Sequence, residues 1–321
     1  MARIEIVTPA RAGSRSGNRH TAARWAAMLR AAGHRVAVRT QWQGERCDLL
    51  VALHARRSNP SIERYRAALP HAPLAVVLTG TDLYRDLPAS AEARRSLELA
   101  DRIIVLQDEA PRLLAPRLRR KTRVVLQSAA PSVRHDPPPH GLRVAVIGHL
   151  REEKDPFRTA AALAHLPADA GVEVVHLGAA LLPRMAGAAR RRMAREPRYR
   201  WLGSVPHART LGWLARSHLL VVSSRMEGGA NVIAEAARIG TPVLASRVSG
   251  NVGMLGRNYP GYFPLGDERA LAKLLQRAAS DTDYHVRLRR ALRARRRLFA
   301  PAAERAALLR ALAPLLRPRE R

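Results

Sequence analysis

The sequence is poor in several residue types, and each shortage excludes a class of protein. A single cysteine, Cys47, rules out an internal disulfide and is typical of a reducing compartment. Aromatic residues make up only 4% of the chain, too few for an evident base-stacking platform. No apolar run approaches the ~18 residues of a membrane-spanning helix. The first residues do not resemble a secretory leader either, because Arg3 opens a short strand-like run. We therefore expect a cytoplasmic protein with no transmembrane segment.

The chain is strongly basic, but its basic residues are almost all arginines and lie in every segment. The formal net charge is +30, yet only three of the 56 basic residues are lysines. A charge of this size is typical of proteins that bind nucleic acid or anionic membranes. Basic residues that are spread over every segment instead indicate a general preference of the whole sequence for arginine and alanine. We expect no nucleic-acid partner, and keep a basic nucleic-acid or membrane-surface binding protein as the distant alternative.

Length and apolar pattern predict two α/β domains. With 321 residues, 47% of them hydrophobic, the chain can bury two substantial cores. Short apolar runs alternate with helical stretches, as in parallel, doubly wound sheets. Strands are expected in the first half at residues 4–8, 36–39, 49–53, 74–78, 103–106 and 124–126, and in the second at 143–147, 172–177, 200–202, 219–222 and 242–245.

A proline-rich segment marks the expected boundary between the halves. Residues 131–141, PSVRHDPPPHG, cannot continue a helix or a strand. We predict an N-terminal Rossmann-like domain over residues 1–130, a linker over 131–141 and a C-terminal Rossmann-like domain over 142–300. The Arg-rich residues 301–321 are predicted to form a helix that packs back across the domains.

The most informative stretch is MEGGANVIAEA, residues 226–236, between two expected strands. Its glutamates, Glu227 and Glu235, stand on either side of a glycine pair, the first on a strand-to-helix loop and the second about two turns further on. Gly228 and Gly229 let the backbone approach a ligand, and the start of the following helix offers free N–H groups to an anion. This pattern outlines a nucleotide-sugar site. The alternative is an ordinary strand–turn–helix connection with two solvated glutamates.

Polar loops also follow the first expected strand of each half. In the first half, Gly17 and Asn18 precede an expected helix and are candidate positions for binding the nucleotide sugar through free backbone N–H groups, although a surface loop explains them nearly as well. In the second half, the segment GHLREEK offers Gly148, His149, Arg151 and Lys154 to an anion. A diphosphate leaving group gathers negative charge as its bond breaks, so cations at this place would stabilise it. The imidazole could equally be buried and hydrogen-bonded, and Arg151 a solvated charge.

Together, the two halves, GHLREEK and EGGANVIAE resemble the family-four glycosyltransferases of GT-B fold. The resemblance implies two Rossmann-like doubly wound domains facing a central cleft, with the acceptor in the N-terminal and the nucleotide sugar in the C-terminal domain. It implies that Lys154 binds the donor diphosphate, Glu227 contacts the donor sugar and Glu235 bonds the ribose hydroxyls. The remaining donor-binding positions implied are Gly203 and Val205 in the nucleobase loop and Gly228, Gly229, Ala230 and Asn231 facing sugar and phosphate.

One position departs from that family. The usual arginine five residues before the lysine is His149 here, so Arg151 is the candidate for the second cation. We expect no cofactor and no metal, because no Asp-x-Asp pair is flanked as a metal site, and cations with helix N-termini can replace Mg²⁺.

Seven sequence segments indicate a more specific resemblance: GNRHTAARWA, ALHARRS, LTGTDLYRD, SLELADRIIVLQ, GHLREEKDP, MEGGANVI and GNVGMLG. Together they resemble the selenosugar synthase family of selenoneine biosynthesis. The resemblance implies an enzyme that forms a carbon–selenium bond by transferring N-acetylglucosamine or glucose from a UDP-sugar to selenophosphate. The alternative is a family-four-like glycosyltransferase with a hydroxyl acceptor on a lipid or glycan.

A selenophosphate acceptor is a small anion, so the N-terminal half should offer cations and hydrogen-bond donors. The candidates follow the third and fourth expected strands: His54, Arg56, Arg57, Thr79, Thr81 and Asp82. Either arginine would clamp the phosphate, or both belong to a solvated helix start. Asp82 either orders its loop by capping or contacts sugar hydroxyls, and capping is the more common use of aspartate.

Overall fold

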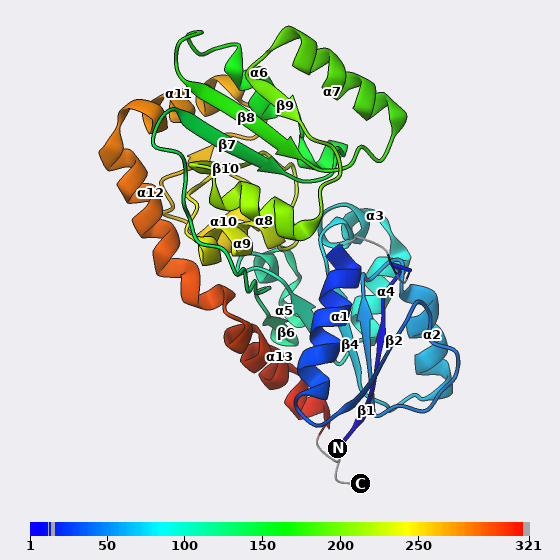
Figure 1. Cartoon of the computed structure of the whole chain (residues 1–321). Coiled ribbons are helices and arrows are strands. Elements are labelled where there is room, and N and C mark those ends of the chain that lie inside the picture. Colours follow the sequence, from blue (N-terminus) through cyan, green and yellow to red (C-terminus); the bar gives the residue numbers. More distant parts are fainter. Residues whose placement is uncertain (12, 14–16, 317–321) are drawn as a thin grey trace. The chain divides into compact units, whose positions relative to one another are not determined.

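The computed structural model describes residues 1–11, 13 and 17–316, and the chain forms two compact units (Figure 1). The first contains Met1–Gln127 and helix α13 (Pro301–Leu316), and the second contains Ser128–Ala300. Each unit is built on one six-stranded sheet in which every pairing is parallel. Residues 131–141, the predicted linker, contain neither helix nor strand.

The first sheet has the strand order β2-β1-β3-β4-β5-β6. Its strands are β1 (Arg3–Val7), β2 (Arg35–Arg39), β3 (Leu49–Leu53), β4 (Leu74–Leu78), β5 (Arg102–Val105) and β6 (Thr122–Val124). Every residue of β3 and β4 is buried, because helices cover both faces of the sheet, which explains their uninterrupted apolar sequences. The helical segments are α1 (Gly17–Arg30), α2 (Asn59–Ala68), the π-helical η1 (Asp82–Asp86), α3 (Leu87–Ala89), α4 (Ala91–Leu99), η2 (Ala110–Leu113) and α5 (Pro116–Arg120).

The C-terminal helix α13 completes one core of this first unit. Leu308 and Leu312 pack in the same buried cluster as Trp25 of α1 and the strand residues of one sheet face. Glu304 is buried and accepts hydrogen bonds from Trp25 Nε1 and Arg24 Nε, both at 2.8 Å. The carboxylate therefore fixes α13 on α1. Residues 317–321 of the predicted terminal helix lie outside the described residues.

The second sheet has the order β12-β11-β10-β7-β8-β9. Its strands are β7 (Leu142–Ile147), β8 (Val172–Leu177), β9 (Tyr199–Trp201), β10 (Leu219–Val222), β11 (Val243–Ser246) and β12 (Tyr262–Phe263). The helical segments are η3 (Glu152–Lys154), α6 (Arg158–Leu163), α7 (Pro183–Arg195), α8 (His207–Ala215), α9 (Asn231–Ile239), α10 (Ser249–Leu255), α11 (Glu268–Ser280), α12 (Thr282–Arg295) and η4 (Arg296–Phe299). Counted from β7, this is the Rossmann order, whose direction of winding reverses between β7 and β10.

The predicted α/β class with two doubly wound, Rossmann-like sheets is confirmed. All eleven expected strands are present, but the one expected at 124–126 begins and ends two residues earlier, as β6. The two-residue strand β12 was not predicted, because two residues carry no periodicity. Among the described residues, no helix has both the length and the hydrophobicity needed to span a membrane.

Candidate functional site

The two loops at the reversal point of the second sheet form a joined site. β7 and β10 are neighbours and parallel, so their carboxyl ends lie side by side, where open α/β sheets bind ligands. Lys154, from the loop after β7, places Nζ 2.6 Å from Oε1 of Glu227, from the loop after β10. Ser224 Oγ donates to the same carboxylate oxygen at 2.5 Å. The Glu227 side chain is 7% exposed and that of Lys154 26%, so solvent reaches the cation more than the carboxylate.

Backbone contacts hold these two loops together. Ser223 Oγ donates to the carbonyl oxygens of Lys154 at 3.2 Å and Asp155 at 2.8 Å. The N–H of Arg225 donates to the carbonyl of Glu153 at 2.8 Å. Gly250 at the start of α10 lies so close that a Cβ there would be 2.0 Å from the carbonyl oxygen of Glu227. The lysine–glutamate pair therefore lies on a rigid frame.

The loop after β8 supports this frame from the other side. His149 Nδ1 accepts a hydrogen bond from the N–H of Ala179 at 3.1 Å, so this nitrogen is used within the protein. His176 is buried beside the Gly148 carbonyl oxygen, 3.2 Å from its Nε2, and burial lowers the pKa of this imidazole to about 4. A Cβ on Gly178 would lie 1.9 Å from the same carbonyl oxygen. Arg151 is exposed and forms no ion pair within the part of the chain that the structure describes.

Glu235 lies on α9, the helix that follows the Glu227 loop. Its side chain is 14% exposed and its Oε1 lies 2.8 Å from Nε2 of His207, at the start of α8, whose side chain is 67% exposed. The hydrogen bond to Glu235 raises the pKa of His207. This contact places a carboxylate beside the loop after β9, where Gly203 has a φ of +68° and Val205 is half-buried.

The remaining predicted donor residues fall into two groups. Gly228 and Ala230 are buried, Gly229 and Asn231 are partly exposed, and Asn231 is the first residue of α9. These residues lie between the two glutamates, on the same loop and helix start. Gly17 and Asn18 instead begin α1 of the first unit, where the Gly17 carbonyl accepts from Thr21 Oγ1 at 3.0 Å. Residues 12 and 14–16 of the loop before them lie outside the described residues.

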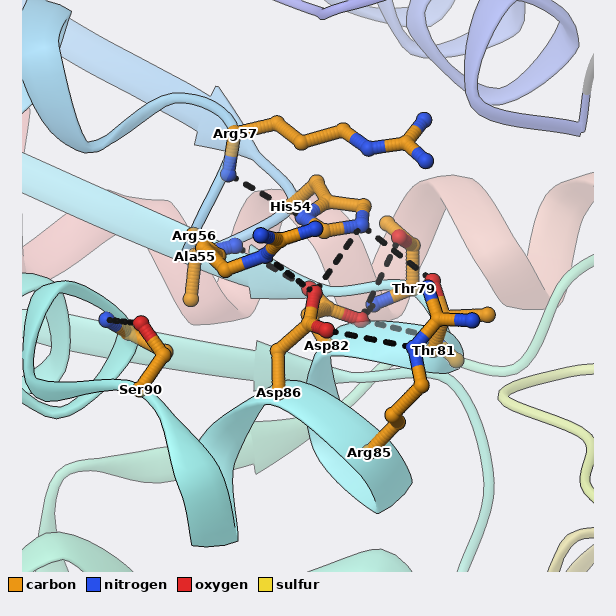
Figure 2. A network of polar contacts seen from close by, with 12 residues as sticks. His54, Ala55, Arg56, Arg57, Thr79, Thr81, Asp82, Arg85, Asp86 and Ser90 are labelled. Atoms are coloured by element: carbon orange, nitrogen blue, oxygen red, sulfur yellow. Dashed lines mark hydrogen bonds and ion pairs between the residues drawn. The ribbon is translucent and has the colours of Figure 1, made fainter.

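In the first unit, Asp82 is the centre of a hydrogen-bond network after β3 and β4 (Figure 2). Its Oδ1 accepts from the backbone N–H groups of Thr79 and Gly80 at 2.8 Å and of Leu83 at 3.2 Å. Its Oδ2 accepts from the N–H of Ala55 at 3.0 Å. The carboxylate is fully buried, so its role in the structure is to join and order the two loops.

His54 follows β3 in the left-handed region, with a φ of 75°. Its Nδ1 accepts from the N–H of Arg57 at 3.3 Å, which leaves the proton on Nε2, 3.2 Å from Thr81 Oγ1. Burial lowers the pKa of this imidazole, so it is neutral near pH 7. A non-glycine residue with this backbone costs about 1–2 kcal/mol, and such strain is common at functional sites.

Two charged residues of this network were not predicted. Asp86, whose side chain is 6% exposed, lies 3.0 Å from Arg56 Nε and 3.3 Å from Arg85 Nε. Burial alone would raise the pKa of Asp86, but the two guanidinium groups hold it below its ordinary value. The spacing Asp82-x-x-x-Asp86 in LTGTDLYRD is a sequence signal for two carboxylates on one helix face, and η1 does place both toward the loop after β3.

No group of three or more His, Cys, Asp or Glu side chains in the described ranges could hold a metal ion. The polar groups described above at the two carboxyl edges are arginines, a lysine, carboxylates, hydroxyls and backbone N–H groups. These are groups that bind anions and hydroxyls.

Residues 141–281 match the family model described as glycosyl transferases group 1. The matched segment lies within the second unit and contains Lys154, Glu227 and Glu235. The second unit is therefore similar to this glycosyltransferase family over most of its length. The comparison with curated proteins gave no match.

Several solved structures share the fold over almost the whole chain. Sucrose-phosphate synthase from Thermosynechococcus elongatus is 18% identical, with a TM-score of 0.78 over 98% of this chain and 99% of that one. Anabaena HepE in complex with UDP-glucose is 16% identical, with a TM-score of 0.79 over 98% and 100%. A glycosyltransferase from Rickettsia africae is 14% identical, with a TM-score of 0.76 over 99% of both chains. The fold is that of the GT-B glycosyltransferases.

Proposed function

We propose that the protein is a glycosyltransferase that binds a UDP-sugar at the carboxyl edge of the second sheet. The Lys154–Glu227 pair at the reversal point of a Rossmann sheet is the observation that carries this proposal. The family match over residues 141–281 and the fold shared with HepE, crystallised with UDP-glucose, support it.

The chemistry assigns a role to each donor residue. Lys154 stabilises the negative charge that gathers on the diphosphate, which is worth about 2–4 kcal/mol for a preorganised donor. Glu227 accepts hydrogen bonds from the sugar, and Glu235 accepts them from the ribose hydroxyls. In the structure each carboxylate has a basic partner, Lys154 or His207, so these contacts rearrange when the donor binds.

The acceptor that we propose is selenophosphate. Its selenium attacks the anomeric carbon of the sugar, the bond from that carbon to the diphosphate oxygen breaks, and the electron pair leaves with UDP. The selenium–phosphorus bond is unchanged in this step. Support comes from the resemblance to selenosugar synthases and from the arginines and N–H groups around His54 and Asp82. A selenium anion needs little help from a general base.

An anaerobic incubation with UDP-N-acetylglucosamine or UDP-glucose and selenophosphate tests both parts of the proposal. UDP release and a selenium-bearing sugar are followed by mass spectrometry, with phosphate and thiophosphate as controls. We expect selenophosphate-dependent UDP release that Lys154→Ala and Glu235→Ala each reduce. UDP release without selenium transfer would contradict the acceptor, and absence of UDP binding would contradict the donor site.

A further inference from the structure

Two arginines contact one buried carboxylate, that of Asp86, at the carboxyl edge of the first sheet, and a third arginine lies on the same loop as one of them (Figure 2). Arg56 and Arg57 follow β3, and Arg85 lies on η1 after the neighbouring strand β4. Asp86 contacts the Nε atoms of Arg56 and Arg85, at 3.0 and 3.3 Å. In Figure 2 the side chain of Arg57 extends past the imidazole of His54. The two contacts to Asp86 hold guanidinium groups from two loops beside each other.

The cluster has more positive than negative charge. The carboxylate of Asp82 is occupied by four backbone N–H groups, and Asp86 is therefore the carboxylate that the arginines contact. The side chains of Arg56 and Arg85 are 42% and 47% exposed, whereas that of Asp86 is 6% exposed. The two guanidinium groups are therefore accessible to solvent, whereas the carboxylate that they contact is buried. Exposed guanidinium groups held in this way are suited to an anionic ligand such as a phosphate group.

The backbone of the loop after β3 also favours this position of the arginines. The strand order β2-β1-β3-β4-β5-β6 reverses direction between β1 and β3, and the loop after β3 begins at this point. That loop starts with the left-handed His54, which is buried and bonded through Nδ1 to the N–H of Arg57. The turn brings two consecutive arginines to the edge of the sheet. Its strain is maintained by the hydrogen bonds that join both loops to Asp82.

We propose that Arg56 and Arg85, held as a pair by Asp86, bind a phosphate dianion, and that this pair receives the phosphate group of the acceptor. Its role as the acceptor site rests on the proposed function, whereas the anion site depends only on the geometry of the first unit. The guanidinium groups donate charge-assisted hydrogen bonds to phosphate oxygens. Asp86 is a positioning residue: it touches the arginines and keeps their forks in place.

Titration with inorganic phosphate tests the anion site directly. The full chain is saturated with UDP, which fills the proposed donor site, and phosphate binding is then measured by calorimetry. Arg56→Gln and Arg85→Gln are each expected to weaken the phosphate Kd about tenfold, the loss of one charge-assisted hydrogen bond. The matched control is Arg190→Gln, an exposed arginine on α7, which removes the same charge and is expected to leave the Kd unchanged. Equal weakening by the control, or an unchanged Kd in the double arginine variant, would overturn the proposal.

Asp86 is tested by separating acceptor from donor effects. Asp86→Asn is expected to raise the phosphate Kd and the KM for selenophosphate several-fold while the UDP Kd stays unchanged, and Asp86→Glu is expected to recover part of the loss. An equal effect of Asp86→Asn on UDP and phosphate would show a general structural role and overturn its assignment. If selenophosphate is not a substrate but the arginine variants lose phosphate binding, the anion site holds and only the proposed acceptor fails.

Discussion

The pair between His207 and Glu235 should make nucleotide binding depend on pH. The hydrogen bond from Glu235 raises the pKa of His207 above its ordinary value of 6.5. The pair therefore stabilises the folded chain fully below about pH 6.5, and this contribution is lost as pH rises through the raised pKa. The affinity for the ribose of UDP should change with pH in the opposite direction, because the ribose hydroxyls must displace the imidazolium of His207 from the Glu235 carboxylate. UDP affinity should increase as pH rises through the same interval.

The exposure of the pair sets the size of this effect. Because the His207 side chain is 67% exposed, solvent screens the ion pair, and its worth is about 0.2–1 kcal/mol. Such an energy corresponds to about a 1.4- to 5-fold change in the Kd of UDP. Glu235 is the only charged group that shifts the pKa of His207, and burial opposes its effect.

The measurement compares wild type and His207→Asn at about pH 5.5 and about pH 8. Phosphate groups such as that of UDP titrate near pH 6, so the Kd of each protein changes with pH for this reason as well. The effect of His207 is therefore measured by the ratio of the two proteins' Kd values at each pH. We expect the variant to bind UDP more tightly than wild type at the lower pH and equally at the higher pH. A ratio that is the same at both pH values would refute the reasoning.

Three further predictions concern single side chains. Lys154→Ala should lower kcat with a UDP-sugar by about 30- to 1,000-fold, because a preorganised cation is lost, and unchanged turnover in steady-state assays would contradict its role. Gly178→Ala should cost about 1–3 kcal/mol in thermal unfolding, since its Cβ would meet the carbonyl oxygen of the loop after β7 at 1.9 Å. Gly212→Ala in α8, where a Cβ meets nothing within 4 Å, is the matched control and should not destabilise. Glu304→Ala should cost about 2–4 kcal/mol in urea unfolding and Glu304→Gln less, because the buried carboxylate loses its hydrogen bonds from Trp25 and Arg24 of α1; equal midpoints would contradict this account.

The sequence predicted the elements with strong apolar patterns. β3, β4, β8 and β10 have the predicted bounds, because buried parallel strands are continuous apolar runs. Helix α9 (Asn231–Ile239) follows the glycine pair as expected, and Gly240 ends it in the left-handed conformation. The loops that carry the candidate donor residues were found for the same reason: each follows a recognisable strand.

Contacts between distant segments could not be predicted. The sequence indicated Lys154 and Glu227 as separate ligand contacts, but their direct ion pair depends on β7 and β10 being neighbours. The contact of Asp86 with Arg56 likewise depends on β3 and β4 being neighbours. Neither pairing leaves a periodic signal, because tertiary structure alone brings the partners together.

The return of helix α13 to the first unit has a consequence for the order in which the protein is made. At synthesis rates of roughly 5–20 residues per second, α13 leaves the ribosome roughly 10 to 40 s after β6. During that interval the apolar positions that Leu308 and Leu312 later cover have no partner from α13. The N-terminal unit therefore finishes folding after the C-terminal unit has been made. A shortened chain that ends before residue 301 would leave this core permanently uncovered.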